Sequence, residues 1–178
     1  VLFRSDQITK EEEEHEQKLL DMLDEERLNY VGSMVLGLND ALVELSGTLA
    51  GLTFAFQNTT LISLSGLITG IAASLSMAAS EYLSSKADNQ PNALKSSIYT
   101  GSAYIVTVIL LVLPYLLIHN PFVALGIMIG TVIFIIFFFN LYISVAKNIG
   151  FKKRFLQMAA ISLGVAGLSF VIGIGIDR

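Results

Sequence analysis

Three carboxylates lie inside long apolar runs of the sequence. Asp40 and Glu44 belong to the first run and Glu81 to the second, and these runs contain no Lys or Arg to pair with them. A charged side chain in the hydrocarbon core of a membrane costs about 3 kcal/mol on the lenient insertion scale, so such residues mark ion or proton pathways by default. The natural partner of each acid is therefore a proton or a bound cation. A protonated acid that only packs against a neighbouring helix is the simpler alternative for any one of them.

Counting along the two runs places these acids at similar depths, together with Met77. At a rise of about 1.5 Å per residue, Asp40 lies about 10 Å and Glu44 about 16 Å from the start of the first run. Glu81 and Met77 lie about 6 Å and about 12 Å from the end of the second run, which returns to the same side. We therefore expect the four side chains to occupy one slab of the membrane.

Glycines share the helical stripes of these residues. Small residues four positions apart let two helices approach closely. We expect the stripes of the first and second runs to face each other, so that the two helices converge on one ion, and the pair Gly126 and Gly130 of the fourth run to serve packing only. The glycines of the two stripes are Gly37, Gly47, Gly51, Gly66 and Gly70.

Met77 bears on which cation fits such a site. Carboxylates alone suit hard cations such as Mg²⁺ or Ca²⁺, whereas a thioether adds softness and favours a transition metal. Asp, Glu and Met together favour Fe²⁺ or Mn²⁺. A methionine that only packs is the alternative at this position.

The elements that must hold these residues are apolar helices. Of the 178 residues, 53% are hydrophobic and 15% are charged, and the mean hydropathy is +0.67; an average globular protein carries about 25% charged residues. A helix needs about 20 apolar residues to cross a membrane. Five runs of that length predict an all-α, polytopic membrane protein, with the transmembrane domain over 33–178: they are 33–56, 61–85, 98–118, 122–146 and 155–176.

The basic residues predict the orientation of this domain. With five spans, ten of the eleven Lys and Arg residues lie on one side, and only Arg178 lies on the other. Because basic residues gather on the cytoplasmic side, we expect a cytoplasmic N-terminus and an extracytoplasmic C-terminus. In a prokaryote the membrane would be the cell membrane.

An acidic helix is predicted before the first span, over residues 1–32. Ten of the fifteen acids lie before residue 27, which predicts a charged cytoplasmic face. Glu12 and His15 have the Glu-x-x-His spacing of di-iron carboxylate sites, so they are weaker candidate metal ligands. A solvated acidic face is the alternative.

Several function classes are excluded by composition. The chain has no cysteine, which excludes disulfides, thiolate metal sites and cysteine nucleophiles. A net charge of −4 gives no basic footprint for nucleic acid. No nucleophile and base are paired by spacing, so we expect neither an enzyme nor a permanently bound cofactor.

Two segments resemble the vacuolar iron transporter family. They are GLNDALVELSGTLAGLTFA at 37–55 and ASLSMAASEYLSSKA at 73–87, which are similar to that family's first and second spans. The resemblance implies a five-helix homodimer that moves Fe²⁺, and often Mn²⁺, out of the cytosol in exchange for protons. It also implies that Asp40 and Met77 are pathway ligands, and Glu81 matches an acid of many microbial members.

The chain departs from the plant-type pattern of this family in two places. The long cytoplasmic metal-binding insert between the second and third spans is replaced by about a dozen residues, and Thr69 stands where a glutamate precedes the methionine. Glu44 is expected to compensate from the facing helix. The acidic helix in turn resembles the last helix of a ferritin-like, rubrerythrin-type domain. Two rival functions follow, a membrane anchor for such a domain and a proton-linked carrier of another cation.

Overall fold

The computed structural model describes residues 31–90, 92–147 and 150–176, and these residues form helices and short turns without a strand. The first helix runs over Val31–Phe56 and is called the 31–56 helix below. The others are α2 (Thr59–Ala87), α3 (Ala93–Leu117), α4 (Pro121–Lys147) and α5 (Phe151–Ile176). Each contains a stretch long and apolar enough to cross a membrane, which confirms the all-α prediction of five candidate spans. The predicted acidic helix lies outside the described residues, except that Val31 and Gly32 belong to the 31–56 helix.

Asparagines begin two of these helices. The side-chain oxygen of Asn58 accepts hydrogen bonds from the backbone N–H groups of Thr60 and Leu61 at 3.0 and 3.1 Å. Asn120 does the same for the first turn of α4. Such caps satisfy N–H groups that a helix cannot bond internally. They explain why a single asparagine in a short break is enough to begin the next span.

The helices extend beyond the apolar runs. In particular, α5 begins at Phe151, four residues before its predicted start at Phe155. Polar side chains can continue a helix past the hydrocarbon core, because the backbone bonds do not depend on side-chain polarity. The first turn of α5 therefore carries Lys152, Lys153 and Arg154, a feature that matters below.

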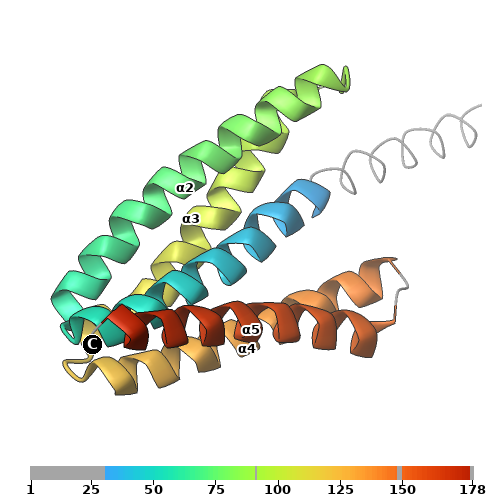
Figure 1. Cartoon of the computed structure of the whole chain (residues 1–178). Helices are drawn as coiled ribbons and strands as arrows, with labels where there is room; N and C mark the ends of the chain where they lie inside the picture. The colour runs from blue at the N-terminus through green and yellow to red at the C-terminus, as the bar shows by residue number, and fades with distance from the viewer. Residues whose placement is uncertain (1–30, 91, 148–149, 177–178) are drawn as a thin grey trace, which may run out of the picture.

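The five helices form two pairs with the 31–56 helix between them (Figure 1). One pair consists of α2 and α3, which lie side by side, and the other consists of α4 and α5. The pairs converge at the end where the C-terminus lies and separate toward the end where the 31–56 helix begins.

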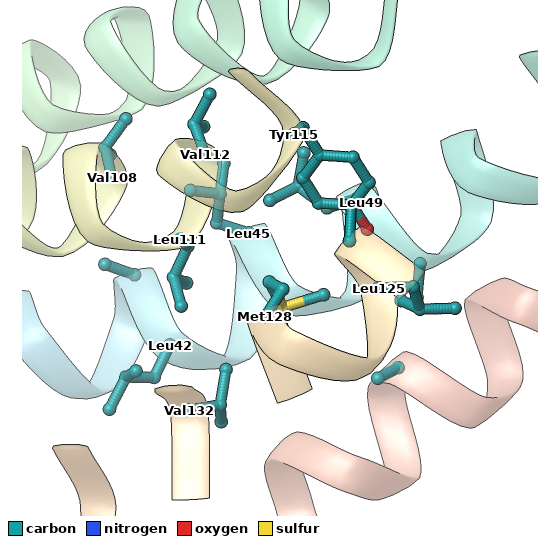
Figure 2. Packing of buried hydrophobic residues seen from close by; sticks show 14 of the residues in the cluster. Leu42, Leu45, Leu49, Val108, Leu111, Val112, Tyr115, Leu125, Met128 and Val132 are labelled. Atoms are coloured by element: carbon teal, nitrogen blue, oxygen red, sulfur yellow. The ribbon is translucent and has the colours of Figure 1, made fainter. Parts of the chain in front are cut away.

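The core lies where the 31–56 helix, α3 and α4 meet (Figure 2). Leu42, Leu45 and Leu49 of the 31–56 helix pack between Leu111 of α3 and Met128 of α4. In contrast, only 11% of the most apolar stretch of α5 is buried inside the chain. Large apolar side chains cover the outer faces of the helices, as expected where the surrounding solvent is lipid.

Candidate metal site

Asp40 and Glu44 form a pair of carboxylates one turn apart on the 31–56 helix. Residues four apart lie on the same face of a helix, and both side chains are exposed at the surface of the single chain. Within the described residues Asp40 makes no hydrogen bond or ion pair. No described residue therefore occupies its carboxylate oxygens, which can take a ligand.

Glu44 is held in place by a tyrosine of α3. The hydroxyl of Tyr104 donates a hydrogen bond to Oε2 of Glu44 at 2.7 Å. Tyr104 itself is fully buried, so its ring is fixed by packing while its hydroxyl reaches the carboxylate. A separation of 2.7 Å is the usual length of a well-formed O–H···O hydrogen bond. One oxygen of Glu44 thus has a protein partner, and the other remains available.

Glu81 lies in a separate group of hydroxyls. Oε1 of Glu81 accepts hydrogen bonds from Ser33 Oγ at 2.8 Å and from Ser85 Oγ at 3.3 Å. Thr100 of α3 donates to the backbone carbonyl of Ser33 at 3.0 Å. These bonds join the beginning of the 31–56 helix to the end of α2 and the beginning of α3.

The single chain does not gather the four predicted ligands into one cluster. Glu81 is bonded at the level of Ser33, which precedes Asp40 by seven residues, or about 10 Å along a helix. Met77 is half-buried against the hydrophobic core. Among the described residues, no group of three or more His, Asp or Glu side chains lies close enough to hold a metal. The four-residue site therefore stays a prediction, with Asp40 and Glu44 as its nearest pair.

The prediction that the glycine stripes of the first two spans face each other holds only at Gly66 of α2, where a Cβ would lie 2.7 Å from a methyl carbon of Leu49 on the 31–56 helix. A Cβ at Gly47 would lie 2.7 Å from a methyl carbon of Val165, and one at Gly51 would lie 3.1 Å from the carbonyl oxygen of Ser169, both on α5. Gly70 of α2 approaches Val108 of α3 instead. The other stripe glycines have their nearest contacts on α3 or α5. Helical spacing shows which glycines share a face, but it does not determine which helix packs against that face.

Gly37, next to the acids, makes the closest approach. A Cβ there would overlap the carbonyl oxygen of Thr100, so α3 packs directly against the backbone of the 31–56 helix one turn before Asp40. This contact sets the separation of the two helices at the level of the carboxylates. It also lets Tyr104, one turn after Thr100, reach Glu44.

Sequence reasoning missed Tyr104 and the hydroxyls around Glu81. A signal was present, since hydroxyl side chains recur at helical spacing along the third apolar run, at Thr100, Tyr104, Thr107 and Tyr115. All four are buried. Tyr115 is the last of the four, and its hydroxyl lies 2.8 Å from the hydroxyl of Thr53, with which it shares a hydrogen bond. A stripe of hydroxyls on a membrane helix indicates the face that meets polar groups of its neighbours.

Glu12 and His15, the weaker candidates, lie outside the described residues. Nothing in the described part of the chain tests a di-iron site or a ferritin-like domain.

Five helices long and apolar enough to cross a membrane support an integral, multi-pass membrane protein. Residues 31–93 match the family model described as VIT family. This segment contains the 31–56 helix and α2, and the match confirms the resemblance to the vacuolar iron transporter family there. It supports membrane transport of metal ions and a transporter rather than an enzyme. No curated protein matches the chain.

Proposed function

We propose that the protein carries Fe²⁺, with Mn²⁺ as a second substrate, out of the cytosol in exchange for protons. The observation that carries the proposal is the pair Asp40 and Glu44, exposed on a helix of membrane-spanning length. Carboxylate oxygens at a protein surface facing lipid are costly unless a cation or a proton neutralises them. Within the described residues neither acid forms an ion pair with Lys or Arg.

The small number of metal ligands that Asp40 and Glu44 supply favours a homodimer. The described part of one chain offers a divalent cation two neighbouring carboxylates at this position, and both side chains are exposed at the surface of the chain. A second copy packed over this face would remove the acids from lipid and add a second pair of carboxylates. Met77 and Glu81 belong to the same proposal as pathway ligands, on the strength of the family resemblance in residues 31–93.

Proton exchange follows from charge balance. A metal ligand must be deprotonated to bind, so metal binding releases protons and affinity falls as the pH falls. Transfer of a divalent cation without a counter-flow would leave two positive charges on the far side. Protons leaving the carboxylates as the metal arrives would carry charge in the opposite direction.

Metal flux into liposomes tests the proposal. The purified protein, reconstituted into vesicles with an Fe²⁺-quenched dye inside, should admit Fe²⁺ and Mn²⁺ faster than protein-free vesicles, and an imposed pH gradient should accelerate uptake. Absence of flux would favour the membrane-anchor alternative. Strong inhibition of Fe²⁺ uptake by Ca²⁺ would favour a carrier of another cation.

A further inference from the structure

A cavity lies between the 31–56 helix and the beginning of α5, apart from the carboxylate pair. Its volume is about 490 Å³, which is of the size that holds a small ligand or a lipid headgroup. Asn39 lines it from the 31–56 helix, and the remaining lining residues come from the start of α5: Gly150, Lys153, Arg154, Gln157 and Met158.

The lining of this cavity is suited to an anion. Lys153 and Arg154 supply two positive charges, Asn39 and Gln157 supply amide groups, and none of the described residues that line the cavity is acidic. Within the part of the chain that the structure describes, neither cation makes an ion pair or a hydrogen bond. The guanidinium of an arginine matches the oxygens of a phosphate with two parallel hydrogen bonds. The positive charges of Lys153 and Arg154 also make this cavity a poor binding site for Fe²⁺ or Mn²⁺.

The position of the cavity also favours an anion as its ligand. Gly150 immediately precedes α5, a helix of 26 residues whose first turn carries no acid. The N–H groups of a first turn lack internal partners and attract anions. Figure 1 shows that this turn lies toward the end of the molecule where the 31–56 helix begins, the end that the basic residues predict to be cytoplasmic. Basic pockets between membrane helices on that side bind phosphate-bearing lipid headgroups.

We propose that this cavity is a binding site for a phosphate-bearing anion, with Lys153 and Arg154 as its charged ligands and Asn39 and Gln157 as hydrogen-bond donors. The anion comes from an anionic lipid headgroup or from free phosphate. The proposal does not rest on the proposed transport function, since its ligands include neither Asp40 nor Glu44, although Asn39 directly precedes Asp40.

Thermal unfolding of the purified full chain in detergent tests this proposal. The additives are phosphatidylglycerol, phosphatidylcholine and inorganic phosphate, each titrated separately, because a ligand that binds the folded state raises the unfolding temperature. The test variant is Lys153→Gln with Arg154→Gln. The matched single-charge comparison is Lys153→Gln against Lys152→Gln, because Lys152 is exposed on the same turn and does not line the cavity.

We expect phosphatidylglycerol to raise the unfolding temperature of the wild type and of Lys152→Gln, with at least tenfold weaker binding in the double variant. A matching response to inorganic phosphate alone would identify free phosphate as the ligand, and a response to phosphatidylglycerol alone would identify the lipid. The proposal is overturned by equal effects of phosphatidylcholine, by no effect of either anion, or by an equal loss in Lys152→Gln and Lys153→Gln. In that case Lys152, Lys153 and Arg154 would serve only to orient the chain in the membrane.

Discussion

At the scale of single residues, the candidate site depends on how each carboxylate is held. Glu44 has a fixed partner in the buried Tyr104, whereas Asp40 has none among the described residues. Glu81 accepts two hydroxyl hydrogen bonds near the end of its helix. We infer that Asp40 is the acid most available to an arriving cation, and that hydroxyl hydrogen bonds hold Glu44 and Glu81 in position.

Tyr104→Phe tests how Glu44 is held. The substitution keeps the buried ring and removes the hydroxyl that donates to Glu44. Because the substitution removes one hydrogen bond, we expect a loss of about 1 kcal/mol in the free energy of unfolding, together with weaker Mn²⁺ binding. Tyr142→Phe is the control, since Tyr142 is exposed on α4. Equal behaviour of the two variants in denaturant unfolding and Mn²⁺ titration would show that the hydrogen bond has no role.

Met77→Leu tests whether the sulfur contacts metal. The change keeps most of the volume of a half-buried side chain and removes the thioether. If Met77 is a ligand, Fe²⁺ binding should weaken relative to Ca²⁺ and Mg²⁺, because only the softer metal gains from sulfur. Competition titrations in detergent measure the ranking. An unchanged ranking would assign Met77 to packing.

At the scale of helices, close approach at glycines fixes the arrangement. In Gly70→Ala the new Cβ would lie 2.5 and 2.8 Å from the two methyl carbons of Val108. Both Val108 methyls are branched from one stiff, buried carbon, so we expect a destabilisation of about 1–3 kcal/mol from overpacking. Chemical unfolding in detergent measures it.

Two comparisons make the Gly70→Ala result specific. Adding Val108→Ala should restore part of the lost stability, because it removes the obstructing methyls. Gly126→Ala should leave the stability of the single chain nearly unchanged, because a Cβ there meets nothing within 4 Å. A Gly70→Ala variant as stable as Gly126→Ala would contradict the described α2–α3 contact.

The spans could be predicted from the sequence, whereas their neighbours could not. Hydropathy is a local property, so the five helices follow from the apolar runs, and only their ends shift, as at Phe151 of α5. Which helix faces Gly47 or Gly70 depends on the packing of all five helices. Tyr104 was missed because a tyrosine in an apolar run is common in packed cores. The carboxylates were found because acids are rare there.

At the scale of the whole molecule, the distribution of Lys and Arg predicts the orientation. The chain has no cysteine, so single cysteines introduced at Glu12, Lys153 and Arg178 can be labelled without a background. In sealed vesicles, an impermeant reagent should label positions 12 and 153 from one side and position 178 from the other. Labelling of positions 12 and 178 from the same side would contradict an odd number of spans.

The central claim is that a transition metal crosses the membrane by way of Asp40. The most direct measurement is the initial rate of Fe²⁺ uptake into vesicles containing wild type, Asp40→Asn or Asp88→Asn. Both variants remove one carboxylate charge at nearly constant volume, but Asp88 lies in the turn after α2. We predict gradient-stimulated uptake for wild type and Asp88→Asn, and a rate at the protein-free background for Asp40→Asn. Wild-type uptake by folded Asp40→Asn, or no uptake by any of the three, would contradict the account.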